Sequence, residues 1–171
     1  SAELIGFSFS LIESEAYYIP LDHKHSISNI NISKEKVIKL LANLFLREDL
    51  TVIGHNIKYD INVLWKYKIS FKCQLQDTML LSYVYNSSSK HDLDSLALKY
   101  LDYETIKYKD LVGSGVKQKL FSEIEVNEAM PYACEDADIT LRLYNYFIDK
   151  FKSLNQQYDL YNNIELPLLN V

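Results

Sequence analysis

A short acidic stretch, YACEDADIT beginning at Tyr132, contains three carboxylates within four residues. On a helix with about 100° per residue, Glu135 and Asp138 fall on a polar face that also carries Arg142. We expect both to be solvated charges, with Asp138 and Arg142 paired across one helical turn. Asp136 instead falls at the edge of an apolar stripe, one turn after Tyr132, so a solvated surface does not explain it.

A second aspartate, Asp60, has the same kind of position, between apolar side chains of a predicted helix and one turn after Asn56. An ionised carboxylate on an apolar face is costly unless hydrogen-bond donors or a cation satisfy it. Either aspartate alone could be satisfied by backbone N–H groups. Because Asp60 and Asp136 each have a polar residue four positions earlier, the pattern favours a shared site that faces inward from two helices.

The chemistry of such a site is that of a hard divalent cation, because Mg²⁺ and Mn²⁺ prefer carboxylate oxygens. A pair of metal ions about 4 Å apart can clamp the attacking and leaving oxygens of a phosphodiester. Two carboxylates are too few to hold such a pair, so the pattern predicts further ligands. Asp77 and Asp94 do not fill this role, because their positions favour helix caps.

The elements that must position these residues follow from hydrophobic periodicity. We predict an antiparallel hairpin, a buried strand, and helices with apolar faces. The strands span residues 3–12, 15–21 and 50–54, and the helices span 33–47, 57–67, 77–85, 93–101 and 126–152. Pro131 either begins or kinks the main part of the last helix. This order indicates an α/β fold, with a mixed β-sheet flanked by helices.

Composition narrows the class of protein. The 171 residues carry a net charge of −5, which argues against a protein that grips long duplex DNA through a basic face. An enzyme that handles one nucleic-acid end remains compatible, because metal ions supply positive charge. No apolar run is long enough for a membrane span. Cys73 and Cys134 lie far apart, so we expect reduced thiols in a cytoplasmic, monomeric protein.

Two motifs carry a family resemblance. GHNIKYDINVL, from Gly54, and YACEDADIT resemble the second and third motifs of the 3′–5′ exonuclease domain of bacterial family A DNA polymerases. This is the DEDDy group of the ribonuclease H-like superfamily. The similarity continues through DTMLLSYVYN, HDLDSLALKYL and NIELPL, and covers essentially the whole chain. It implies a ribonuclease H-like fold and two-metal removal of nucleotides from the 3′ end of single-stranded DNA, for proofreading.

The resemblance also implies roles for individual residues. Asp60 matches the carboxylate that helps to hold the second metal, partly through water, and Asp136 matches a ligand of the first metal. Tyr132 matches the tyrosine that orients the attacking water. These three residues are therefore the expected catalytic set, with Mg²⁺ or Mn²⁺ as the cofactor.

Five further residues match positions near the substrate. Asn56 lies where the family contacts the 3′ end, and His55 stands where a glutamine is common. Tyr59 belongs to the same motif, and His91 aligns with a segment near the single strand. Tyr108 aligns with an aromatic residue that packs near the terminal nucleotides, although it could instead be a half-buried surface aromatic.

The sequence departs from the family at the first motif. An Asp-x-Glu on a strand roughly ten residues before ELIGFSFS is absent from the 171 residues. We therefore expect a sheet without its first strand, half of a four-carboxylate site, and weak or no catalysis by this chain alone. Residues 1–160 would form the exonuclease domain, and residues 161–171 would begin the connection to a following polymerase domain.

The expected partners are the single-stranded DNA 3′ end and that polymerase domain, with no role for a membrane. Two alternatives stay open. The chain could be a catalytically inactive, exonuclease-like structural domain of a polymerase. It could also be a ribonuclease D-like 3′–5′ exoribonuclease with the same chemistry, although the HDLDSLALKYL and NIELPL segments favour the polymerase branch.

Overall fold

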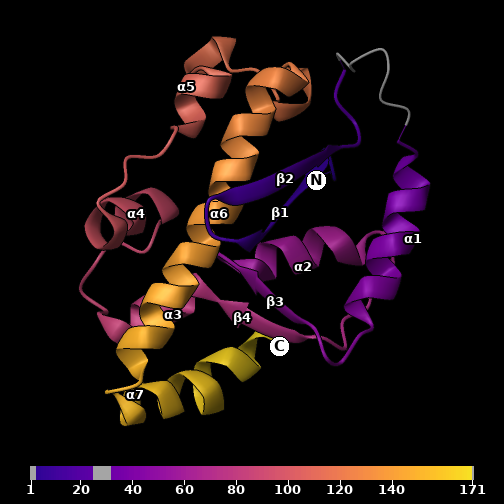
Figure 1. Ribbon diagram of the computed structural model, residues 1–171. Helices are drawn as coiled ribbons and strands as arrows, with labels where there is room; N and C mark the ends of the chain where they lie inside the picture. Colours follow the sequence, from indigo (N-terminus) through magenta and orange to yellow (C-terminus); the bar gives the residue numbers. More distant parts are fainter. Residues whose placement is uncertain (1–2, 25–31, 171) are drawn as a thin grey trace.

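The computed structural model describes residues 3–24 and 32–170, and it shows helices packed around two short pairs of strands (Figure 1). The predicted domain limits at residues 1 and 171 lie outside this described part. The strands are β1 (Gly6–Ile12), β2 (Glu15–Pro20), β3 (Thr51–Gly54) and β4 (Gln74–Asp77). The helices are α1 (Lys34–Phe45), α2 (Ile57–Trp65), α3 (Thr78–Tyr85), α4 (Leu93–Leu101), α5 (Tyr108–Val112), α6 (Val126–Phe151) and α7 (Asn155–Leu160).

The strands confirm the predicted α/β class but form two small sheets. β1 and β2 are antiparallel, with Gly6 opposite Pro20, whereas β3 and β4 are parallel, with Gly54 opposite Asp77. Within the described residues, no strand hydrogen bonds join the two pairs, so they do not form the single mixed sheet expected from the sequence. Both pairs nevertheless pack against the same helix, because α6 contacts β1, β2 and β3.

The fourth strand was not predicted, because its sequence, QLQD, lacks the alternation of apolar and polar residues that marks a strand. The helix predicted from Asp77 begins one residue later, at Thr78, since Asp77 ends β4 and caps α3. The first two helices end at Phe45 and Trp65, two residues before their predicted ends. The differences in these three helices are confined to their ends, where sequence periodicity is weakest.

The longest helix, α6, carries Tyr132 and Asp136 across the molecule (Figure 1). Pro131 lies in its second turn, and the helix continues through it from the cap residue Glu125. The apolar face of the helix is buried at Ala129, Ala133, Ile139, Leu143, Phe147 and Phe151. Across the described part of the chain, no helix combines the length and the apolar character that a membrane crossing needs.

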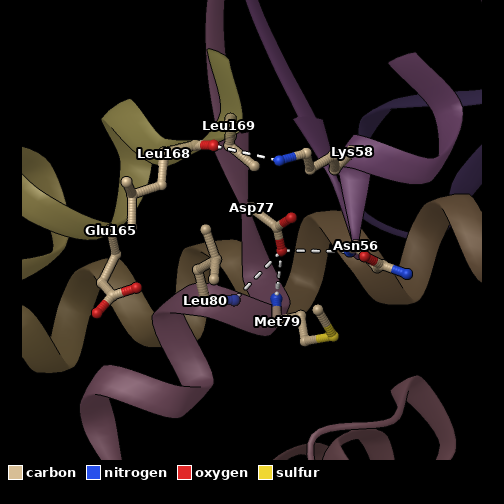
Figure 2. A pocket seen from close by; sticks show the side chains of 8 residues that line it. All are labelled: Asn56, Lys58, Asp77, Met79, Leu80, Glu165, Leu168 and Leu169. Atoms are coloured by element: carbon tan, nitrogen blue, oxygen red, sulfur yellow. Dashed lines mark hydrogen bonds between the residues drawn. The ribbon is translucent and has the colours of Figure 1, made fainter. Parts of the chain in front are cut away.

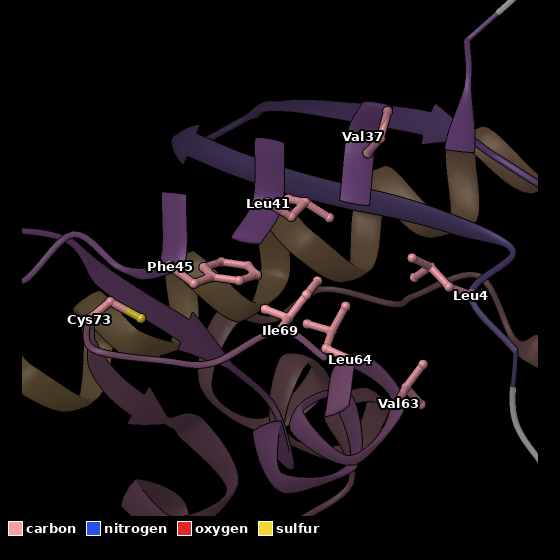
Figure 3. Packing of buried hydrophobic residues seen from close by; sticks show 8 residues of the cluster. All are labelled: Leu4, Val37, Leu41, Phe45, Val63, Leu64, Ile69 and Cys73. Atoms are coloured by element: carbon pink, nitrogen blue, oxygen red, sulfur yellow. The ribbon is translucent and has the colours of Figure 1, made fainter. Parts of the chain in front are cut away.

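Two hydrophobic clusters hold the helices that carry the candidate site residues. The first packs α1 against α2 and the segment before β4, and its buried members are Leu4, Val37, Leu41, Phe45, Val63, Leu64, Ile69 and Cys73 (Figure 3). The second joins α3, α4, α6 and the chain after α7, through Leu81, Leu96, Ala97, Ile139, Leu143, Phe147, Phe151 and Tyr161. The first cluster therefore fixes α2, and the second fixes α6.

Candidate functional site

Tyr132 and Asp136 lie one turn apart on α6, and both are half-buried. Burial raises the pKa of the Asp136 carboxyl to about 7; hydrogen bonding from Tyr132 opposes the shift, and the charges of Glu135 and Asp94 add to it. The pKa of the Tyr132 hydroxyl is raised, first by burial and then by the Asp136 charge. The pair therefore combines a carboxyl group that would favour a nearby cation with a phenol that stays protonated and can donate a hydrogen bond.

Two aromatic rings lie next to Tyr132, and one of them is exposed to solvent. The ring centroid of Tyr132 lies 5.8 Å from that of Tyr108 and 6.2 Å from that of Phe121. Tyr108 also stacks on Phe121 at 6.4 Å, and it remains 43% exposed. The structure thus brings Tyr108 next to Tyr132. Phe121 had no signal in the sequence that linked it to the site.

Glu135 corrects a prediction, because it is not a solvated surface charge. Its carboxylate accepts a hydrogen bond of 2.9 Å from the Tyr103 hydroxyl and one of 2.7 Å from the backbone N–H of Ile106. Both partners come from the segment that leads into α5. Glu135 therefore ties the segment before Tyr108 to α6, directly beside Asp136.

Asp94 also differs from its prediction. The cap of α4 is Asp92, which accepts a hydrogen bond of 2.9 Å from the backbone N–H of Ser95. Asp94 lies inside the helix, where it accepts a 2.6 Å hydrogen bond from Thr105 and forms an ion pair with Lys107 at 3.2 Å. Like Glu135, it holds the segment that precedes Tyr108.

Asp138 is half-buried and not simply solvated. Its predicted ion pair with Arg142 is confirmed at 3.7 Å. Its other carboxylate oxygen accepts a 2.5 Å hydrogen bond from the backbone N–H of Ser14, in the turn between β1 and β2. Asp138 thus fastens the hairpin to α6 and has a structural role two positions from Asp136.

A second group of predicted site residues lies around Asp77, which is only 1% exposed. Its carboxylate accepts hydrogen bonds from the backbone N–H groups of Met79 and Leu80, which confirms the predicted cap of α3. It also accepts from Asn56 and Ile57, at 3.2 and 2.9 Å, so it caps α2 as well. Figure 2 shows Asp77 between Asn56, at the start of α2, and the start of α3 at Met79 and Leu80. The sequence did not predict the second cap, because Asn56 lies 21 residues away.

Asn56 is held in a left-handed conformation, with φ 57°, at the start of α2. Its side chain is exposed and makes no cap hydrogen bond, so it is free to meet a substrate. The tight turn before it depends on Gly54, since a Cβ atom there would lie 2.8 Å from the Cβ of Ile57. Gly54 therefore permits the close approach that presents Asn56 at the end of β3.

Asp60 does not face inward as predicted. Its side chain is exposed in the first turn of α2, whereas Val63 and Leu64, in the next turn, pack into the first hydrophobic cluster. Neighbouring atoms still remove enough water from the carboxyl group to raise its pKa to about 6, and the charge of Asp77 adds to this effect. Tyr59 is 58% exposed beside it.

Two histidines line the start of α3. His55 Nδ1 lies 2.9 Å from the Thr78 hydroxyl, and burial lowers the pKa of its imidazole while the Asp77 charge opposes that shift. His91 Nδ1 lies 2.9 Å from the Ser82 hydroxyl, and its buried Nε2 atom has no hydrogen-bond partner. Both predicted substrate residues are thus anchored to α3, on the Asp77 side of the site.

The described residues contain no group of three or more His, Cys, Asp or Glu side chains that could hold a metal ion. Asp60 and Asp136 nevertheless carry a chemical group that can bind a metal ion. Each is a carboxyl group whose pKa is raised by loss of water, and a nearby cation relieves the cost of its charge. The residues present therefore fit a hard divalent ion, as part of a ligand set.

Comparison with known proteins identifies the family of the chain. A family model described as 3′–5′ exonuclease, of family A DNA polymerases, matches residues 1–152. Over 99% of its length the chain is 39% identical to DNA polymerase I of Pseudomonas aeruginosa, and over all of its length it is 38% identical to that of Borreliella burgdorferi. It is 30% identical to the DNA polymerase of Escherichia phage T5. The chain spans 18–20% of the length of these relatives. It therefore belongs to the 3′–5′ exonuclease domain family of family A DNA polymerases.

Proposed function

We propose that the chain is the proofreading exonuclease part of a DNA polymerase I, and that it removes nucleotides from the 3′ end of single-stranded DNA. The observation that carries this proposal is the pairing of Tyr132 with Asp136 beside the exposed ring of Tyr108, within a chain of this family. The first two supply a water-orienting hydroxyl and a metal ligand. The third supplies a surface for the terminal base.

In the proposed reaction, the Tyr132 hydroxyl donates to Asp136, accepts a hydrogen bond from the attacking water, and so holds that water in line with the scissile bond. The water oxygen bonds to the terminal phosphorus, and the bond from phosphorus to the preceding 3′ oxygen breaks. The leaving 3′ oxygen gains the proton that the water loses, and a nucleoside monophosphate leaves. Asp60 and Asp136 would hold Mg²⁺ or Mn²⁺. When bound, these ions supply positive charge to the phosphate and lower the pKa of the attacking water.

Other parts of the proposal concern the complete protein. We propose that the remaining carboxylate ligands come from outside these 171 residues, so that the chain alone has little activity. Residues 161–171 would begin the connection to the polymerase domain. The protein would act as a monomer in the cytoplasm, where the free thiols of Cys73 and Cys134 stay reduced.

The test uses the complete polymerase with end-labelled, single-stranded DNA and RNA in the presence of Mg²⁺. We expect mononucleotides from the 3′ end of DNA and slower release from RNA. Faster release from RNA would instead support a ribonuclease D-like enzyme. No release from either, in a preparation with full polymerase activity, would support a structural domain without catalysis.

A further inference from the structure

His23 is a buried histidine that the proposed reaction does not use. It follows β2, it is 9% exposed, and both of its ring nitrogens have hydrogen-bond partners. Its Nδ1 atom lies 2.9 Å from the backbone oxygen of Ile124, and its Nε2 atom lies 2.6 Å from the Tyr18 hydroxyl. A carbonyl oxygen can only accept, so Nδ1 donates to Ile124. Burial raises the pKa of the Tyr18 hydroxyl to about 12, so this group stays protonated and can donate to Nε2.

A row of aromatic rings leads from the β1–β2 hairpin through His23 to Tyr132. The His23 ring centroid lies 5.9 Å from that of Tyr18 and 5.6 Å from that of Phe121. The ring of Phe121 in turn packs against Tyr132. The hairpin end of the row depends on Gly6, because a Cβ atom there would overlap the Tyr18 hydroxyl. His23 therefore joins the hairpin to the ring that lies beside the proposed water-orienting residue.

Phe121 begins the short turn η2 (Phe121–Glu123), which is attached to the chain around His23 at two points. The backbone N–H of Lys24 donates to the Ser122 oxygen at 2.7 Å. The second attachment is the His23 bond to Ile124, directly after the turn, where Ile124 is only 1% exposed. A buried carbonyl oxygen without a donor is costly, so this bond fixes the end of η2.

Tyr108 also stacks on Phe121, but it has a separate anchor. Glu135 and Asp94 hold the segment that precedes it. The ring of Tyr132 depends instead on its hydroxyl bond to Asp136 and on the rings beside it. Loosening of η2 should therefore affect the placement of Tyr132 more than that of Tyr108.

We propose that His23 is a positioning residue for the exonuclease reaction. By holding the end of η2 through Ile124, it keeps Phe121 against Tyr132 and so fixes the hydroxyl that orients the attacking water. His23 acts only through these neighbours. The inference rests on the proposed exonuclease function. A small displacement of a group that orients a reactant lowers the rate of the chemical step, so the effect should fall on kcat.

Two replacements of His23 separate positioning from packing. The amide nitrogen of Asn can take the place of Nδ1 and keep the bond to Ile124. The side-chain oxygen of Gln can take the place of Nε2, so it keeps the acceptor for Tyr18 but loses the bond to Ile124. Each variant leaves one buried polar group without its partner, so we expect similar losses of stability in urea unfolding of the chain.

The activities of the two variants should differ although their stabilities are similar. In the complete polymerase, His23→Gln should lower kcat for single-stranded DNA about tenfold, with KM within about twofold of the wild type. His23→Asn should keep kcat within about threefold, because the bond that holds η2 is retained. Val37→Ala, at a buried position on α1, is the control for lost stability, and it should keep the wild-type kcat.

Hydrogen exchange gives a readout that does not depend on catalysis. The backbone N–H of Ile124 donates to the Phe121 oxygen across η2. In the complete polymerase, its exchange should become about tenfold faster in His23→Gln and stay near the wild-type rate in His23→Asn.

Equal losses of kcat in the two His23 variants would show that His23 only fills space, and would overturn the proposal. A wild-type kcat in His23→Gln would overturn it too, as would a raised KM with unchanged kcat, because His23 would then act on DNA binding. A wild-type polymerase that degrades no DNA would instead contradict the proposed function. The exchange of Ile124 would then still decide whether His23 holds η2.

Discussion

The Asp136 carboxyl group is ionised at a cost to the folded state, because its surroundings withhold water and contribute further negative charge. Its neighbour Asp138 avoids this cost through Arg142 and the backbone of Ser14. Two aspartates two positions apart therefore differ in their surroundings. Of these two aspartates, Asp136 is the one whose charge a bound cation would stabilise.

Replacing Asp136 with asparagine should make stability less dependent on pH. The folded-state pKa of about 7 exceeds the ordinary value of 3.8, so the folded chain binds more protons between these values. The free energy of unfolding of the wild type should therefore fall as pH rises from about 4 to about 7. Asp136→Asn should be more stable than the wild type at pH 8, by on the order of 2 kcal/mol after allowance for solvent exposure, and similar at pH 4.

Urea unfolding with a chelator at both pH values measures this difference. Asp138→Asn is the control, and it should lose stability at both, because it weakens the contacts with Arg142 and Ser14. An equal effect of Asp136→Asn at pH 4 and pH 8 would contradict the raised pKa.

At the scale of residues, helical periodicity alone separated Asp136 from the other two acids of its stretch. It failed for Glu135, because the partners of that carboxylate, Tyr103 and Ile106, come from a segment about thirty residues earlier. It failed for Asp60 because periodicity identifies the apolar face of a helix but not which turns of that face pack against other elements. The turn of Asp60 is exposed, whereas the next turn is buried.

At the scale of elements, the site depends on junctions between segments that are distant in sequence. Asp77 joins the start of α2 to the start of α3, and thereby fixes Asn56. Glu135 and Asp94 hold the chain before α5, and thereby bring Tyr108 to Tyr132. Each junction consists of a carboxylate that binds groups from a second element.

Loss of the Asp77 carboxylate should destabilise two helices at once. Four backbone N–H groups lose their acceptor in Asp77→Ala, and two caps at about 1–2 kcal/mol each predict a loss of about 2–4 kcal/mol. Asp92→Ala removes one exposed cap, and should cost about 1 kcal/mol. Chemical denaturation of both variants gives the comparison. Equal losses would refute the double cap.

Glu135→Gln should loosen the segment before α5 without unfolding the chain. The backbone N–H of Ile106 donates to the Glu135 carboxylate, so its hydrogen exchange should become about tenfold faster when that charge is removed. The backbone N–H of Leu96, which donates to the Asp92 oxygen at the start of α4, serves as the internal control. Unchanged exchange at Ile106 would show that Glu135 does not hold this segment.

The sequence predicted the hairpin, β3 and the longer helices because each carries a clear apolar pattern. It missed β4, because these four residues do not form an apolar face. It also missed α5 and α7, because both are too short to show a helical period. The packing of both strand pairs against α6 also depends on contacts that no local pattern encodes.

At the scale of the whole molecule, the two predicted metal ligands belong to separately packed parts. α2 is held by the first hydrophobic cluster and α6 by the second, so a cation between Asp60 and Asp136 would couple the two. Ligand binding of this kind stabilises the folded state by mass action.

Divalent-ion affinity should therefore depend on pH in a defined direction. Asp136 must lose its proton to bind an ion, and its pKa is about 7, so Mn²⁺ should bind about tenfold more weakly at pH 6 than at pH 8. Calorimetric titration of the chain tests this, with Asp136→Ala as the comparison. An affinity that is equal at both pH values, or unaffected by Asp136→Ala, would remove Asp136 from the ligand set.

We propose that Asp136, and not its acidic neighbours, serves the reaction. The most direct measurement compares 3′–5′ degradation of single-stranded DNA by the complete polymerase carrying Asp136→Ala or Asp138→Ala. We expect Asp136→Ala to lower kcat by more than about a hundredfold. Loss of a residue that only hydrogen-bonds to a metal ligand already lowers activity by about tenfold to a hundredfold, and loss of the ligand itself should cost more. Asp138→Ala should stay within severalfold of the wild type. Wild-type degradation by the Asp136→Ala polymerase would show that Asp136 does not serve the reaction.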